Sequence, residues 1–148
     1  MTLIDKISDD LKKAMKSGDS TTVSVLRMIK SSIKNREIEK GEVPGDDEVL
    51  DILSLFVKRS KESVEQFTKA ERADLVDKEK AEQSVVLQYL PRQLGEDEIR
   101  KIVSEAISET GSSVPGDMGK VMKTVMAKLK GKADGKLVNS LVKEMLEV

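Results

Sequence analysis

Apolar residues recur every three or four positions along the chain, which is the spacing of one face of an α-helix. In the first part of the sequence this pattern predicts four helices, from residue 2 or 3 to 17, from 19 or 20 to 41, from about 47 to near 70, and from roughly 73 to 90. We expect the second of these to bury Val25, Leu26, Ile29, Ile33 and also Ile38. The pattern contains no convincing strand.

Polar and conformationally special residues mark the ends of these helices. Thr2 is a suitable N-cap for the first helix, and Gly18 stands where that helix should stop. The turn "GEVPGDD" separates the second helix from the third. Pro91 ends the fourth, because the residue before a proline disfavours helical geometry.

The remainder predicts three shorter helices after the linker "YLPRQLGEDEI", in which Gly95 can act as N-cap with Glu98 at the third helical position. Their apolar residues lie at 99–107, 118–129 and 137–145, and "GSSVPGD" is predicted to be a loop. The chain is therefore predicted to be all-α with about seven helices. We expect an N-terminal four-helix module, residues 1–91, and a small C-terminal three-helix module, residues 95–148.

Composition narrows the possible chemistry. Aromatic residues make up only 2% of the chain, so the core must be aliphatic, and there is no Cys and no His. The absence of both residue types excludes thiolate zinc sites and nucleophiles activated by histidine. We expect no catalytic residue, no cofactor and no metal, and since no apolar run could span a bilayer we expect a cytoplasmic protein without a membrane partner.

Charge is balanced overall, at −1, but it is distributed unevenly near the C-terminus. Residues 115–148 hold seven lysines against four acidic residues, whereas residues 95–114 hold two basic and five acidic residues. Several of the lysines surround "KGKADGK", residues 130–136. Any anionic partner should therefore be met by this local patch and not by the net charge.

Two interpretations of "KGKADGK" are open. Lysines and glycines before a helix start can form a phosphate site. Alternatively, the segment is a helix-helix turn with solvated lysines, in which Asp134 caps the last helix and repels a phosphate. On the residues alone, the solvated turn is the simpler interpretation.

Other charged positions favour structural roles. Arg27, Lys30 and Lys34 share one face of the second predicted helix, which is typical of a solvated face. Glu79 and Glu82 fall near the apolar stripe of the fourth helix, and we expect partly buried salt bridges there. The aromatic residues occupy core-like positions, so any RNA binding would depend on backbone and shape.

Three segments carry a resemblance to a known family. They are "LRMIKSSIKNREIEKG" from Leu26, "RADLVDKEKAEQSVVLQYLPRQL" from Arg72 and "GDMGKVMKTVMAKLKGKADGKLVNSLVKEML" from Gly116. Together, over essentially the entire chain, they resemble the YqeY-like family. The last segment is also similar to the C-terminal tail of the B subunit of the aspartyl/glutamyl-tRNA amidotransferase.

The resemblance implies an all-helical protein whose last three helices are similar to a tail that approaches the body of a tRNA. The matching segment covers residues 118–123 and 130–139. It implies RNA-facing roles for six residues: Lys120, Lys123, Lys130, Lys132, Lys136 and Asn139. The apolar positions Val121, Leu137, Val138 and Leu141 in the same segment are better explained as core.

The amidotransferase resemblance does not extend to catalysis. That B subunit activates mischarged tRNA with ATP in a separate domain, and no part of this chain resembles it. A family label of carbon-nitrogen ligase with glutamine as amido-N donor would therefore rest only on the resemblance of the tail. We expect no such activity from this chain alone.

Three functions stay open at this stage. The preferred one is a noncatalytic tRNA-binding or tRNA-associated accessory protein. The second is participation in tRNA-dependent amidation, with the catalytic groups supplied by a partner. The partners we expect are tRNA and a tRNA-dependent amidotransferase, an aminoacyl-tRNA synthetase or another protein. The third is a protein-interaction module in which the four-helix half presents an apolar groove to a partner helix.

Overall fold

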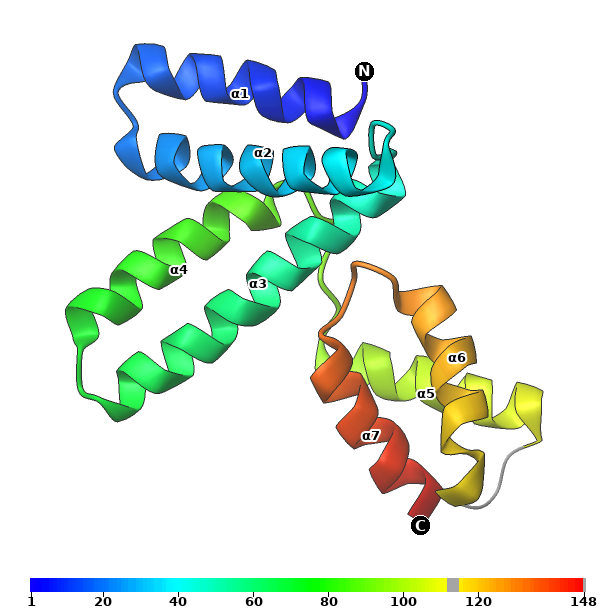
Figure 1. Ribbon diagram of the computed structural model, residues 1–148. Helices are drawn as coiled ribbons and strands as arrows, with labels where there is room; N and C mark the ends of the chain where they lie inside the picture. Colours follow the sequence, from blue (N-terminus) through cyan, green and yellow to red (C-terminus); the bar gives the residue numbers. More distant parts are fainter. Residues whose placement is uncertain (112–114, 148) are drawn as a thin grey trace. The chain divides into compact units, whose positions relative to one another are not determined.

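The computed structural model describes residues 1–111 and 115–147, and its α-helices are shown in Figure 1. In order they are α1 (Leu3–Ser17), α2 (Ser20–Lys40), α3 (Asp46–Lys69), α4 (Ala73–Leu87), α5 (Glu96–Thr110), α6 (Met118–Leu129) and α7 (Gly135–Glu147), with a short 3-10 helix η1 (Pro115–Asp117) before α6. The described residues contain no strand, so the predicted all-α fold of four and then three helices is confirmed. Residues 112–114 of the predicted loop and residue 148 lie outside the described residues.

Short polar side chains and glycines set the helix ends. The Thr2 hydroxyl accepts a hydrogen bond from the Asp5 amide at 3.2 Å, and the Asp5 carboxylate accepts one from the Thr2 amide at 3.3 Å. Gly18 ends α1 in the left-handed conformation, with φ of 75°. Asp19 then caps α2 by accepting from the Thr22 amide at 3.1 Å. These contacts satisfy backbone groups that a helix terminus leaves unpaired.

The contacts divide the chain into two compact units, Met1–Leu90 and Pro91–Val148. In the first unit α1 packs along α2 and α3 packs along α4 (Figure 1). The core of this unit is formed by aliphatic residues of all four helices together with Tyr89: Ile7, Leu11, Val25, Leu26, Ile29, Ile33, Val49, Ile52, Leu53, Val57, Val85, Val86 and Tyr89. The Tyr89 hydroxyl donates to the Asp10 carboxylate at 2.5 Å, which joins the end of the α4 segment to α1.

The second unit has its own core, in which α5, α6 and α7 contact one another. Its buried residues are Ile99, Val103, Ala106, Val121, Val125, Leu129, Val138, Leu141, Val142 and Leu146. At the start of α5 the Gly95 amide donates to the Glu98 carboxylate at 3.2 Å, which confirms the predicted helix start. No helix in the described part of the chain has the length and apolarity needed to cross a membrane.

Two side chains that were predicted to be buried are exposed. Ile38 is 69% exposed, because it follows Ile33 by five residues and so lies about 140° around α2 from it, at 100° per residue. Leu137 is 38% exposed, since it lies about 100° from Val138, at the edge of the α7 apolar stripe. Both predictions were wrong for the same reason: they extended an apolar stripe to a position outside the buried arc.

Candidate nucleic-acid interface

Helix α6 directs its lysines away from the core of the second unit. Val121, Val125 and Leu129 are fully buried, so they fix the inward face of the helix. Lys120 and Lys123 lie on the opposite side and are exposed. Both ammonium groups are therefore available to an anionic partner.

Helix α7 carries a second exposed polar row. Its inward face is fixed by Val138, Leu141 and Val142. Lys136 and Asn139 are exposed, and the same row continues to the exposed Lys143. Lys143 was missed as a candidate, although its position seven residues after Lys136 places it on the same helix face.

The turn between α6 and α7 is held by the linker that precedes α5. The Gln93 side-chain amide donates to the Gly131 carbonyl at 2.7 Å, and the Leu94 amide donates to the Lys132 carbonyl at 2.9 Å. Gly131 has φ of 73°, a conformation that favours glycine. The backbone of the turn is thus ordered, while the Lys132 side chain and the preceding Lys130 are exposed.

At the start of α7, a carboxylate already accepts a hydrogen bond from one of the backbone amides that the helix leaves unpaired. The Asp134 carboxylate accepts from the Lys136 amide at 3.2 Å, which confirms the predicted cap. A phosphate at the same amides would have to displace this carboxylate. The geometry therefore favours an open lysine surface over a phosphate cradle at the helix start.

Several acidic residues of the second unit pair with cations outside this set of lysines. Lys128 pairs with Glu109 of α5 at 2.9 Å, and Arg100 pairs with Glu96 at 2.8 Å and with Glu144 at 3.3 Å. Within the part of the chain that the structure describes, Lys120, Lys123, Lys132 and Lys136 have no ion-pair partner within 4.0 Å. We call the six exposed residues Lys120, Lys123, Lys132, Lys136, Asn139 and Lys143 the lysine face.

The carboxylates singled out on α4 do not form the expected salt bridges. Among the described residues, neither Glu79 nor Glu82 has a cation within 4.0 Å. Burial, and then the neighbouring Glu79, raise the pKa of Glu82. The described residues also contain no group of three acidic side chains placed to hold a metal ion.

Comparison with known proteins gives one family over almost the whole chain. The family model described as Yqey-like protein matches residues 4–146. A protein of the fungus Pyrenophora tritici-repentis named "Altered inheritance of mitochondria protein 41, mitochondrial" is 31% identical over 150 residues, which cover 97% of this chain and 81% of that protein.

Proteins with the same name in two other fungi match shorter segments. The Lachancea thermotolerans protein is 35% identical over 112 residues, covering 74% of this chain and 60% of its own length. The Eremothecium gossypii protein is 39% identical over 85 residues, covering 57% and 46%. The matched segments thus span less than two thirds of these two relatives.

Proposed function

The chain belongs to the YqeY-like family, and from this premise we propose that it is a noncatalytic tRNA-binding or tRNA-associated accessory protein. The observation that carries the proposal is the lysine face, whose residues are exposed on α6, on α7 and in the turn between them. The resemblance of this same segment to the amidotransferase tail adds support. The fungal relatives carry no RNA-related function in their names.

The chemistry of the second unit favours contacts with phosphates. Residues 91–148 contain no aromatic side chain, so this unit has no platform on which unpaired bases could stack. Lysine side chains neutralise phosphates without reading sequence. A folded RNA with closely spaced backbones is therefore a better ligand for this unit than a single strand.

The proposal also includes the protein partners of the chain and its location in the cell. A tRNA-dependent amidotransferase or an aminoacyl-tRNA synthetase would bring the chain and its RNA together, and no catalytic step is assigned to the chain itself. We propose a cytoplasmic location, whereas the fungal relatives are named as mitochondrial. Fractionation of the source cells, followed by immunodetection, tests this location.

The binding proposal is tested by titrating fluorescently labelled bulk tRNA with the full chain and following anisotropy at about 50 mM and about 150 mM salt. We expect saturable binding that weakens with salt. Lys132→Glu plus Lys136→Glu should weaken binding about tenfold or more and make the slope of log affinity against log salt shallower by about two, one for each lost phosphate contact. A glutamate in the first turn of α7 suits the helix dipole, so the variant should stay folded.

The matched control is Lys12→Glu plus Lys69→Glu, which makes the same change in net charge on exposed positions of the first unit. This control should bind tRNA nearly as tightly as the natural chain. If both double variants bind like the natural chain, or if both lose binding equally, the lysine face is not the RNA-binding surface.

A further inference from the structure

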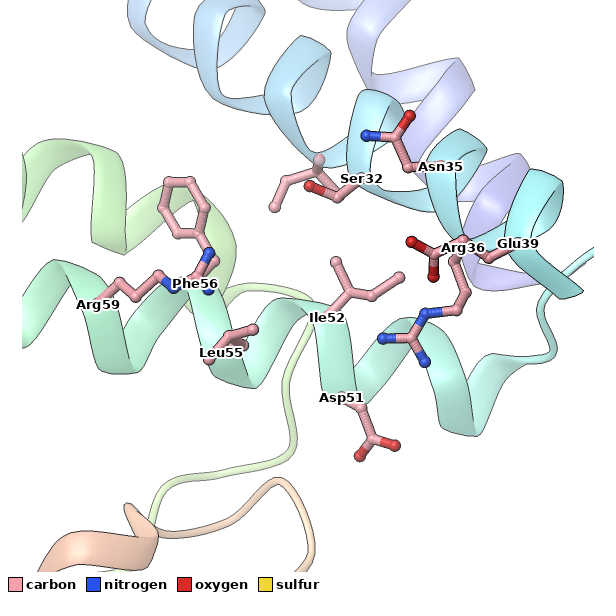
Figure 2. A pocket seen from close by; sticks show the side chains of 10 residues that line it. Ser32, Asn35, Arg36, Glu39, Asp51, Ile52, Leu55, Phe56 and Arg59 are labelled. Carbon is pink, nitrogen blue, oxygen red and sulfur yellow. The ribbon is translucent and has the colours of Figure 1, made fainter.

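The first unit contains a groove that the proposed RNA-binding function does not use. A pocket of about 250 Å³ lies between α2 and α3 (Figure 2), and a neighbouring hollow of about 530 Å³ extends from it to α4. The two share Ser32, Phe56 and Arg59 as lining residues, so they form one continuous depression. We call this depression the α2–α3 groove.

Apolar side chains form the floor and both rims of the α2–α3 groove. Ile29 and Ile52 are buried at its floor, and Phe56 is half-buried beside them. Met28 of α2 is 44% exposed and Leu55 of α3 is 43% exposed. Together with Phe56 they give the groove an apolar surface that a partner could cover.

The polar groups of the groove are unequally distributed. Arg27 and Arg59 line the hollow near α4, with Glu79 as its carboxylate. At the other end Figure 2 shows Arg36 reaching from α2 toward α3, near Asp51 and Glu39. Arg36 thus has two carboxylates beside it, whereas Arg27 and Arg59 share Glu79 alone. The excess of positive charge therefore lies at the α4 end of the groove, beside Met28.

We propose that the α2–α3 groove docks an amphipathic helix of a partner protein, with the apolar stripe of that helix covering Met28, Leu55 and Phe56. Carboxylates beside the stripe would face Arg27 and Arg59, whose planar guanidinium groups bind carboxylates through two parallel hydrogen bonds. A helix suits the groove because both walls are themselves helical, and on α3 the apolar lining residues Ile52, Leu55 and Phe56 follow the i, i+3, i+4 spacing of one helix face. The inference is independent of the lysine face.

The experiment uses a fluorescein-labelled synthetic helix of roughly 16 residues, about 24 Å long, with leucines at i, i+3, i+4 and i+7 and glutamates beside them. Its counterpart carries lysines in place of the glutamates. Anisotropy is measured with the full chain. We expect saturable binding of the acidic peptide and binding at least about tenfold weaker for the basic peptide.

Variants then locate the contact. Leu55→Asp and, separately, Arg27→Glu plus Arg59→Glu should each weaken binding of the acidic peptide about tenfold, because one removes an anchor and the other reverses the charge. Lys132→Glu plus Lys136→Glu should leave peptide binding unchanged, and Arg27→Glu plus Arg59→Glu should leave tRNA binding unchanged. Circular dichroism of each variant checks that its helices are intact.

Three outcomes would overturn the inference. Equal binding of the acidic and basic peptides would show unspecific hydrophobic contact. Loss of peptide binding in the Lys132 and Lys136 variant alone would place the peptide on the lysine face. Sedimentation showing a dimer of the chain that Leu55→Asp dissociates would show that a second copy covers the groove.

Discussion

Tyr89 connects the segment that follows α4 to α1, the first helix of the same unit. It is the only tyrosine of the chain, it is 8% exposed, and its hydroxyl donates to Asp10 at 2.5 Å. The Lys6 ammonium lies 5.5 Å from the ring centroid. Removing the hydroxyl should therefore lower stability, and removing the Asp10 carboxylate should change the titration of the phenol.

Tyr89→Phe should lower the free energy of unfolding by about 1–2 kcal/mol, because a hydrogen bond to a charged acceptor is lost. Urea denaturation followed by circular dichroism measures the change. Asp10→Asn and the double variant complete a cycle that isolates the pair. If the two single changes are additive, the hydroxyl and the carboxylate do not stabilise each other.

The titration of the tyrosine gives a second test of the same residue. Burial first, and then Asp10, raise the pKa of Tyr89 above its ordinary value of about 10. The folded state thus keeps the phenol proton, and its contribution to stability is present below the ordinary pKa and lost as pH rises through the folded pKa. Ultraviolet absorbance should show that Asp10→Asn moves this pKa back toward the ordinary value. An unchanged pKa in that variant would contradict the contribution of Asp10.

The pKa of Glu82 is also raised, but its ordinary pKa lies well below 7, so Glu82 lowers stability at a neutral pH at which the Tyr89 contribution is still present. Its raised pKa means that the folded state favours the protonated form, so the ionised form lowers stability at neutral pH. Glu82→Gln should therefore raise the free energy of unfolding at pH 7 slightly, and the gain should disappear as pH falls below the ordinary pKa. Urea curves over pH, with the exposed Glu62→Gln as control, test this. A gain that persists in acid would point to a cause other than ionisation.

At the scale of elements, the turn between α6 and α7 shows two glycines with different roles. Gly131 has a positive φ and its carbonyl accepts from Gln93, whereas Gly135 begins α7. A methyl group added at Gly135 would meet only the Met126 methyl at 3.9 Å, an ordinary contact. The same substitution should therefore have opposite effects at the two sites.

Gly131→Ala should destabilise the chain by about 1–2 kcal/mol, because alanine is strained at positive φ. Gly135→Ala should be neutral or stabilise by up to about 1 kcal/mol, since alanine restricts the unfolded chain more than glycine does. Thermal unfolding of the two variants side by side measures the difference. Equal melting temperatures would mean that the positive φ of Gly131 is not needed.

Local signals explain which elements could be predicted. Thr2, Gly18, Asp19 and Asp134 act within four residues of their own positions, so the helix ends follow from sequence. The tie from Gln93 to Gly131 joins residues 38 apart, and no spacing rule reports such a contact.

Solvent exposure was only partly predictable. The errors at Ile38 and Leu137 have the same origin as the success at Val138: periodicity gives a direction, whereas the width of the buried arc depends on the neighbouring helices. The α2–α3 groove likewise needs two helices in place before its lining can be identified. For the lysine face, the sequence supplied every member except Lys143, and the structure supplied their exposure.

At the scale of the molecule, each unit has a separate hydrophobic core. We therefore predict that residues 91–148 fold in isolation and retain tRNA binding, while residues 1–90 fold without binding tRNA. Helical circular dichroism with a cooperative melt checks folding, and anisotropy checks binding. A fragment 91–148 that is unfolded, or a fragment 1–90 that binds as tightly, would contradict the prediction.

A fragment starting at residue 95 should behave differently from one starting at residue 91. It lacks both donors, Gln93 and Leu94, that hold the Gly131 and Lys132 carbonyls. We expect the shorter fragment to melt at a lower temperature. Equal melting of the two fragments would show that these hydrogen bonds add no stability.

The linker-held turn also has an entropic consequence for any ligand of the lysine face. Fixing the backbone of one residue costs about 1–2 kcal/mol of conformational entropy. Because hydrogen bonds from Gln93 and Leu94 already order the backbone at Gly131 and Lys132, that cost is met during folding and not at the moment of association. When Lys132 binds a phosphate, only its side chain then loses conformational freedom. The entropic cost of binding should therefore be lower for this turn than for a flexible tail with the same lysines.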